Sequence, residues 1–324
     1  MSQAASPAVI ALDWGTSSLR ASLLGHEGHV LDRRARPWGI QHLPEGGFVA
    51  ALRGIAGDWR DRWPALPVVA AGMVGSRGGW REVPYVRCPA DPAAIAAGLV
   101  AFDGGCGTLS LVPGLIQEGG LPDVMRGEET QILGALATDP ALADGSLLVL
   151  PGTHSKWARV EGERIVGFTT YLTGELFALL REHSLLGRPA RDAGAAPAAA
   201  ADVTPDEWSP DAAFQRGLRT ARESGAAGIA GRIFSARSLF LTGGLSATQT
   251  LDYLSGLLVG EEIRSVLAGL GAGGCPPLVL LGDPALCRRY RAALAAFDIG
   301  QVRSLDDTGP AGVWRIARAA GLVA

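Results

Sequence analysis

The sequence predicts an α/β protein built of two related halves, and three observations carry this prediction. Short apolar strands alternate with stretches of helical periodicity along most of the chain. An apolar strand, a polar turn with Gly and Thr, and a second strand occupy residues 8–25, and the same order returns at 146–160. The chain has 324 residues, of which 48% are hydrophobic, so it can bury two cores.

The first half opens with a predicted hairpin. AVIAL (8–12) has the composition of a buried strand, DWGTSS (13–18) that of a tight polar turn, and LRASLLG (19–25) that of a second strand. The patterns that follow predict, in order, a strand at 67–74, a glycine-rich loop at 75–80, a helix at 90–102 and a strand at 108–115.

The second half begins with an acidic helix. DVMRGEETQILGALATDP (123–140) opens with acids and places Ile132, Leu133 and Leu136 on one helical face. The segment 188–210 is rich in Ala and Pro and reads as a surface loop. The remaining patterns predict the repeated hairpin from 146, a helix from Thr173, a helix at 250–270, a strand at 276–282 and helices at 283–297 and 309–323.

Composition limits the classes of partner. The net charge of −3 provides no general basic field, so we expect neither a nucleic-acid nor a membrane partner. The four cysteines form no CxxC pair, which argues against a zinc site and a disulfide framework. We expect no signal peptide, because no basic region precedes the first apolar stretch, and no apolar run reaches the roughly 20 residues that span a bilayer. We therefore expect a cytoplasmic protein; the oligomeric state stays open, a homodimer included.

Common nucleotide-binding and hydrolase signatures are missing. The chain has no GK dipeptide and hence no Walker A loop, and it has no GxSxG elbow. Gly269, Gly271 and Gly274 match GxGxxG, but they follow a predicted helix and precede a strand, the reverse of the dinucleotide-binding context.

Two polar turns are better candidates for binding phosphate. In DWGTSS, Asp13 precedes small residues whose backbone amides and hydroxyls can face an anion, although an acid in a turn often only satisfies backbone donors. PGTHSKW (151–157) offers a second such turn with Lys156, the only lysine of the chain. A lysine acts as a compact point charge near phosphate, but it is also compatible with a solvated turn in an arginine-rich protein. Two such turns, one in each half, are stronger evidence for phosphate binding than either turn alone.

The combination of these segments resembles the sugar kinase, heat-shock ATPase and actin superfamily. Within it, AGMVGSRGGW, VPYV, VPGL, VMRGEETQ, PGTHSKW, TGEL and HSLLG resemble the 2-dehydro-3-deoxygalactonokinase family. The resemblance is dense from residue 8 to about residue 187 and looser beyond. It implies two ribonuclease H-like domains, 1–127 and 128–324, with an interdomain cleft and with the helix at 309–323 packing back on the first domain.

The resemblance also implies ATP and Mg²⁺ as cofactors and the 6-hydroxyl of 2-dehydro-3-deoxy-D-galactonate as the phosphoryl acceptor, in galactonate catabolism. Asp13 would organise Mg²⁺. The residues expected to contact the phosphates and the rest of the nucleotide are Gly15, Thr16, Ser17, Gly152, Thr153, His154, Ser155, Lys156 and Gly282. Alternatives are a kinase of the same fold for another sugar or sugar acid, and a non-catalytic sugar- or nucleotide-sensing protein.

The general base would be a carboxylate at the start of the acidic helix, Glu128 or Glu129, although many kinases of the superfamily use aspartate. A simple acidic first turn that stabilises the helix dipole is the structural alternative. The carboxylate of a sugar acid calls for arginine. Candidates for binding the sugar acid are Arg20, Gly75, Ser76, Arg77, Trp80 and Arg126, of which Trp80 is equally compatible with a place in the core.

Overall fold

The computed structural model describes residues 6–105, 107–194, 212–270 and 274–324. The chain divides into two compact units: Met1–Leu148 with Ala158–Thr169 and Asp307–Ala324, and Val149–Trp157 with Thr170–Asp306. The bounds 1–127 and 128–324 expected for the ligand-binding domains stay a prediction.

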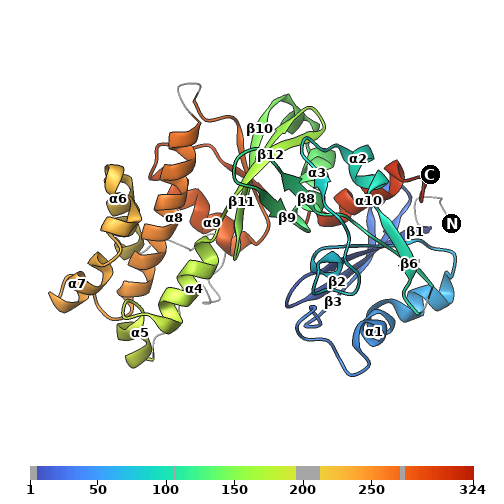
Figure 1. Ribbon diagram of the computed structural model, residues 1–324, viewed down its shortest axis with the longest axis horizontal. Coiled ribbons are helices and arrows are strands. Elements are labelled where there is room, and N and C mark those ends of the chain that lie inside the picture. Colours follow the sequence, from blue (N-terminus) through green and yellow to red (C-terminus); the bar gives the residue numbers. More distant parts are fainter. Residues whose placement is uncertain (1–5, 106, 195–211, 271–273) are drawn as a thin grey trace. The chain divides into compact units, whose positions relative to one another are not determined.

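The first unit contains a six-stranded sheet in the order β3-β2-β1-β4-β7-β6. Figure 1 labels β1, β2, β3 and β6 of this sheet. Its first three strands form an antiparallel meander, and β4 and β7 then add in parallel to β1. The strands are β1 (Pro7–Trp14), β2 (Leu19–Gly25), β3 (Val30–Arg36), β4 (Val68–Ala71), β6 (Val100–Asp103) and β7 (Thr108–Leu111). A small separate sheet comprises β5 (Val86–Arg87), β8 (Leu115–Gln117) and β9 (Asp123–Met125).

A five-stranded sheet repeats this order as β12-β11-β10-β13-β14. Three consecutive strands again lie in reverse order, followed by two later strands, and β13 pairs in parallel with β14. The strands are β10 (Ser146–Leu150), β11 (Ser155–Glu161), β12 (Arg164–Tyr171), β13 (Leu278–Leu281) and β14 (Arg303–Leu305). The shared order confirms the α/β class and the relation between the two halves.

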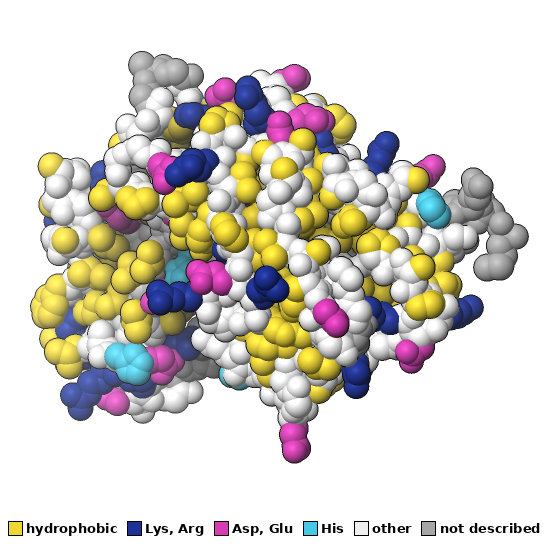
Figure 2. All heavy atoms as spheres, turned by 45° about the vertical axis from the view of Figure 1, so that its right-hand side comes forward, with side chains coloured by type: hydrophobic (Ala, Val, Ile, Leu, Met, Phe, Trp, Pro, Cys, Tyr) yellow, Lys and Arg dark blue, Asp and Glu magenta, His cyan; other side chains and the backbone are white. Residues whose placement is uncertain are grey.

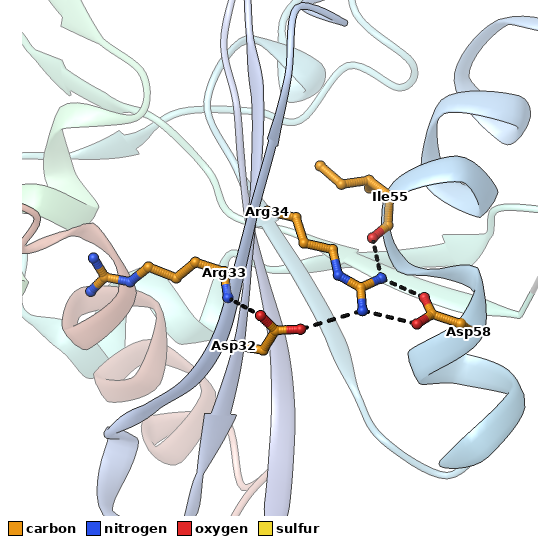
Figure 3. A network of polar contacts seen from close by, with 5 residues as sticks. All are labelled: Asp32, Arg33, Arg34, Ile55 and Asp58. Atoms are coloured by element: carbon orange, nitrogen blue, oxygen red, sulfur yellow. Dashed lines mark hydrogen bonds and ion pairs between the residues drawn. The ribbon is translucent and has the colours of Figure 1, made fainter.

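Helix α1 (Gly47–Arg62) covers the first sheet and was not predicted. It buries Leu52, Ile55 and Trp59 in the core that β1 and β2 build. Figure 3 shows how Arg34 of β3 fastens this helix: its guanidinium donates to the Ile55 carbonyl at 3.0 Å and to the Asp58 carboxylate at 2.9 Å. Asp32 accepts from the same guanidinium at 3.3 Å, so the edge strand and the helix share one ionic network.

Helices α3 (Glu128–Thr138) and α10 (Gly309–Ala319) cross in very close contact within the first unit. A Cβ atom at Gly134 would lie 1.7 Å from the Thr308 carbonyl oxygen, and one at Gly312 would lie 1.7 Å from that of Thr130. The Thr308 hydroxyl donates to the Gln131 carbonyl at 2.8 Å. The C-terminal helix therefore fixes the helix that begins with the two glutamates.

The second unit adds a helical layer centred on α8 (Gln249–Gly269). Helix α6 packs closely on it, since a Cβ atom at Gly217 would lie 2.2 Å from the Tyr253 carbonyl oxygen. The other α-helices described are α2 (Pro92–Ala97), α4 (Thr173–His183), α5 (Arg188–Asp192), α6 (Ala212–Arg222), α7 (Ser235–Leu241) and α9 (Pro284–Ala295). Short 3-10 turns lie at His26–Gly28, Met73–Gly75, Pro140–Asp144, Gly225–Ala227 and Ile229–Gly231.

Four predicted elements differ from the structure. The strand expected at 108–115 ends at Leu111 as β7, and Leu115 begins β8 in the small sheet. The helix expected at 90–102 ends at Ala97, because Gly98 caps it and β6 begins at Val100. The helix expected from residue 123 starts at Glu128, since Asp123–Met125 pair as β9. The loop expected at 188–210 begins with helix α5, and its residues 195–211 lie outside the described part of the chain.

The surface agrees with the charge balance of the sequence. On the face drawn in Figure 2, Lys and Arg side chains are interspersed with Asp and Glu side chains and form no single basic patch. Among the described residues, no helix combines the length and the apolar character that a membrane crossing requires.

Candidate active site

The first polar turn joins β1 to β2 in the first unit. Asp13 pairs in register with Arg20 across the hairpin, and their side chains form an ion pair at 3.3 Å. The Gly15 amide donates to the Ser18 carbonyl at 2.9 Å and closes the turn. Thr16 and Ser17 are exposed at its tip. The hydroxyls and the carboxylate of the turn are therefore open to a ligand.

Asp13 is electrostatically perturbed. Nearly half of its side chain, 48%, meets solvent, yet the protein atoms around the carboxylate desolvate it and raise its pKa above the usual aspartate value. The charge and hydrogen bond of Arg20 oppose this rise, and the negative charge of Asp307 adds to it. A cation bound beside Asp13 would favour the ionised carboxylate and so lower this pKa.

The loop at residues 39–41, which the sequence patterns did not single out, holds the backbone of the first turn in place. The Ile40 amide donates to the Gly15 carbonyl at 3.0 Å, and the Gln41 amide donates to the Thr16 carbonyl at 3.2 Å. A Cβ atom at Gly39 would lie 2.2 Å from the Thr16 carbonyl oxygen and 2.3 Å from the Ser17 nitrogen. Glycine is therefore required at residue 39 for the loop to approach the turn.

The acidic helix start lies next to this turn. Parallel pairing of Asp13 with Ala71 places Gly72 beside the carboxylate: a Cβ atom at Gly72 would lie 3.5 Å from the Asp13 Oδ1. Gly127, the residue before α3, approaches Gly72 so closely that its own Cβ would lie 3.2 Å from the Gly72 Cα. The structure thus brings Asp13 and the first residues of α3 together within one unit.

Glu128 and Glu129 have different environments. The half-buried Glu128 accepts from the Arg126 amide at 3.0 Å, whereas the fully buried Glu129 accepts from the Gly127 amide at 2.7 Å through Oε2. Within the described residues, the buried Glu129 Oε1 finds no hydrogen-bond partner. Burial, reinforced by the charge of Glu128, raises the pKa of Glu129 to about 8. Such a carboxyl is a candidate for proton transfer.

Arg126 has unused donors. Its Nη2 donates to the Val83 carbonyl at 2.7 Å, and its guanidinium lies 4.4 Å from the centre of the Tyr85 ring. Its Nε and Nη1 are buried and have no hydrogen-bond acceptor in the part of the chain that the structure describes. A Cβ atom at Gly75 would lie 3.0 Å from Nη1, so the glycine makes room for the guanidinium. Arg126 can therefore offer N–H groups to an anion if its surroundings open.

The other residues predicted to contact a sugar, Ser76, Arg77 and Trp80, have different environments. The Ser76 hydroxyl donates to the Met73 carbonyl at 2.7 Å and thereby closes the glycine-rich loop. Arg77 is exposed. Trp80 stacks on Phe48 at 5.3 Å between ring centres and meets Trp14 edge-on at 5.8 Å, which places the ring in an aromatic cluster of the core. The ring therefore supports the loop from inside.

The second polar turn lies in the other unit, between β10 and β11. Its tip consists of Thr153 and His154, which are exposed, and Gly152, which is half-buried. Helix α4 begins against this turn: the Glu175 amide donates to the Thr153 carbonyl at 3.0 Å, and the Glu175 carboxylate pairs with His154. A Cβ atom at Gly174 would lie 2.5 Å from the Gly152 carbonyl oxygen, which explains the glycine of the TGEL motif.

Ser155 and Lys156 are buried rather than displayed. Ser155 is 0% exposed and its hydroxyl lies 2.8 Å from that of Tyr290, while Lys156 is 4% exposed. Only the backbone and the tip of the turn are open in this conformation. Gly282 follows β13 with a φ of +113°, which glycine adopts readily, and Asp283 then caps α9 through the amides of Ala285 and Leu286 at 2.9 Å.

The residues fit a magnesium ion of the partly hydrated kind. Across the described ranges, no group of three or more His, Cys, Asp or Glu side chains has the arrangement of a closed metal site. Mg²⁺ typically binds one or two carboxylates and fills its other positions with water and substrate phosphate oxygens. Asp13, desolvated and yet open on one side, matches that donor set.

Comparisons with known proteins identify relatives that match most of the chain. The 2-dehydro-3-deoxygalactonokinase of Escherichia coli (strain K12) is 35% identical over 315 residues, which cover 96% of this chain and 97% of that protein. A Rhizobium meliloti (strain 1021) protein assigned the same activity is 38% identical over 299 residues, with 91% of each chain covered.

Solved structures show the same fold. A crystal structure of a Sinorhizobium meliloti protein assigned to this enzyme superposes with a TM-score of 0.82 at 37% identity and covers 96% of this chain and 98% of that one. Component A of the Acidaminococcus fermentans (R)-2-hydroxyglutaryl-CoA dehydratase, at 12% identity and a TM-score of 0.53, shares the fold alone. The profile described as 2-keto-3-deoxy-galactonokinase matches residues 13–316, and the chain therefore belongs to that family.

Proposed function

We propose that this protein is an ATP-dependent kinase that phosphorylates the 6-hydroxyl of 2-dehydro-3-deoxy-D-galactonate in galactonate catabolism. The family, and the activity that the Escherichia coli relative is named for, support the reaction class and the substrate. The observation that carries the proposal within this chain is the approach of Gly127 to Gly72. This contact brings the start of the helix that carries the buried Glu129 close to Gly72, which lies next to the Asp13 carboxylate.

We assign the base to Glu129. The acceptor oxygen attacks the γ-phosphorus of ATP, the bond from that phosphorus to the bridging oxygen breaks, ADP leaves, and the hydroxyl proton passes to the carboxylate. A pKa of about 8 matches a group that takes up a proton near neutral pH. Glu129 has no exposed surface, so its side chain must rotate toward the acceptor hydroxyl before the transfer.

Asp13 would hold Mg²⁺ together with water and phosphate oxygens. The bound ion would neutralise charge on the phosphates, as in other phosphoryl transfers. Thr16 and Ser17, both exposed in the first turn, would donate hydroxyl and amide hydrogens to phosphate oxygens. Arg20, already paired with Asp13, would keep that carboxylate oriented.

The second turn would contact the nucleotide phosphates through Gly152, Thr153 and His154, the residues at its tip. Lys156 would act as a buried positive charge behind the turn, and Gly282 would let the adenosine side lie close to the backbone. Arg126 would bind the carboxylate of the sugar acid, because two of its donor nitrogens lack an acceptor among the described residues.

A coupled assay that detects ADP release tests the proposal. Purified protein is given ATP, Mg²⁺ and either 2-dehydro-3-deoxy-D-galactonate, a panel of other 2-keto-3-deoxy acids, or neutral hexoses. We expect turnover with the named acid and a loss of at least about 100-fold in kcat/KM with neutral hexoses, because they leave a buried arginine unpaired. Preference for another acid would shift the substrate within the kinase class, and binding without turnover would favour a sensing protein.

A further inference from the structure

A buried glutamate of the second unit lies at the junction of every element that carries a predicted nucleotide contact there. Glu262, on α8, is 2% exposed. Its Oε1 accepts from the Trp157 indole nitrogen at 2.6 Å, and its Oε2 accepts from the Tyr290 hydroxyl at 2.8 Å and from the Thr173 hydroxyl. Three donors from three different elements therefore share one carboxylate.

Each donor leads to a different part of the proposed nucleotide site. Trp157 belongs to β11, three residues beyond His154 at the tip of the second turn. Thr173 is the first residue of α4, the helix whose Glu175 amide holds the Thr153 carbonyl. Tyr290 belongs to α9, which begins directly after the Gly282 turn. All of these residues lie in one compact unit.

The direction of the hydrogen bonds follows from the carboxylate. The Tyr290 hydroxyl spends its single proton on Glu262, so toward the Ser155 hydroxyl, 2.8 Å away, it can only accept. Ser155 therefore points its proton inward. The carboxylate thus fixes the rotamer of a residue at the end of the turn as well as the spacing of the three elements.

The energetic cost of burying Glu262 indicates that this residue does more than fill space in the core. Burial raises the pKa of Glu262, and the hydrogen bonds from Thr173, Trp157 and Tyr290 oppose the rise. Burying a carboxylate is costly, and an apolar residue of similar volume would usually hold helices together as well or better. A buried, fully hydrogen-bonded acid instead fixes the orientation of the groups that bind it.

We infer that Glu262 is a positioning residue for the nucleotide half of the site: it sets the second turn, the start of α4 and the Gly282 turn in one fixed arrangement. Glu262 itself touches no substrate. Its loss therefore weakens the binding of ATP and leaves the binding of the sugar acid, which rests on the first unit, nearly unchanged. This inference rests on the proposed kinase function.

Glu262→Gln tests the inference with little change of volume. The amide nitrogen of glutamine cannot accept a hydrogen bond, so the Tyr290 hydroxyl must accept from it instead of donating. The Ser155 hydroxyl then loses its fixed direction of donation to Tyr290. We expect KM for ATP, and Kd for ATP measured by calorimetry without sugar acid, to rise at least about tenfold, while KM for the sugar acid stays within about twofold. Tyr290→Phe, which removes the link to Ser155 alone, should change the same constants in the same direction by a smaller factor.

Glu261→Gln is the matched control, because Glu261 is the neighbouring acid on α8 and pairs only with Arg264 among the ion pairs of the described chain. It should leave both KM values unchanged. Wild-type affinity for ATP in a folded Glu262→Gln protein, checked by thermal unfolding, would overturn the inference. Equal losses for ATP and sugar acid would also overturn it, since they indicate general destabilisation. Failure of the wild-type protein to bind ATP would instead refute the proposed function.

Discussion

Gly127 lies directly against Gly72, so closely that a Cβ atom on Gly127 would lie 3.2 Å from the Gly72 Cα. Gly72 directly follows β4, whose Ala71 pairs with Asp13 of β1. Gly127 precedes the helix that carries Glu128 and Glu129. Both have positive φ, +95° for Gly72 and +108° for Gly127. The approach of the carboxylate of the turn to the acidic helix therefore depends on two residues without side chains.

Gly127→Ala should move the start of α3, with Glu128 and Glu129, away from Asp13. The Ala side chain meets both a strained φ and the backbone of Gly72, so we expect about 1–3 kcal/mol of lost stability and a fall of at least tenfold in kcat. Chemical denaturation and steady-state kinetics measure the two effects. Gly57→Ala, in the interior of α1 with its nearest neighbour 3.9 Å from the added Cβ, is the control and should not lower either quantity. A Gly127→Ala protein with normal kcat would show that this contact does not set the active geometry.

The activity should rise with pH in a way that depends on Glu129. A base must be deprotonated to accept a proton, so with a pKa of about 8 the value of kcat/KM should increase about tenfold per pH unit below pH 8 and level off above it. Glu129→Gln should abolish this rise and lower kcat at least about 100-fold.

Glu128→Gln gives a different signature. The charge of Glu128 is the second cause of the raised pKa of Glu129, so its removal should move the same rise to lower pH while activity persists. The reverse result, in which Glu128→Gln abolishes turnover and Glu129→Gln retains it, would transfer the role of base to Glu128.

The same carboxyl links stability to pH. The folded chain raises the pKa of Glu129 from 4.5 to about 8, so it binds a proton that the unfolded chain releases between these values. The stabilisation from the neutral carboxyl is present below pH 4.5 and is lost as pH rises to about 8. Relative to wild type, Glu129→Gln should therefore gain stability between pH 5 and pH 8, by up to about 4 kcal/mol. Urea denaturation at both pH values measures the difference, and a constant difference would contradict the raised pKa.

Local signals in the sequence predicted much of the fold. The hairpin turns, the long helix α8 and the Asp-Pro start of α9 all carry strong signals within a few residues. Helix α1 carries none at its start: Gly46, in a left-handed conformation with no side-chain cap, precedes it. Strand β9 escaped prediction because its three residues, Asp123–Met125, pair only with β8 and look locally like the start of the acidic helix.

The chemistry of the site was harder to predict than its position. The two turns and the acidic helix start are recognisable from residue type and spacing. The inward orientation of Ser155 depends on Tyr290, 135 residues away, and that of Trp157 on Glu262, 105 residues away. No local pattern contains such pairs. Gly39 escaped notice for the same reason, since only the folded loop brings it against Thr16 and Ser17.

Lys156 is the only lysine of the chain, and its 4% exposure suggests a reason why it is not an arginine. A larger guanidinium in a packed site should cost about 1–3 kcal/mol of stability and shift the neighbouring turn. Lys156→Met removes the charge and roughly keeps the shape, so it separates the two effects. If the charge supports phosphate binding, Lys156→Met should raise KM for ATP at least about tenfold with a near-normal melting temperature, whereas Lys156→Arg should lower the melting temperature as well. Unchanged ATP kinetics in a folded Lys156→Met protein would assign the lysine to packing alone.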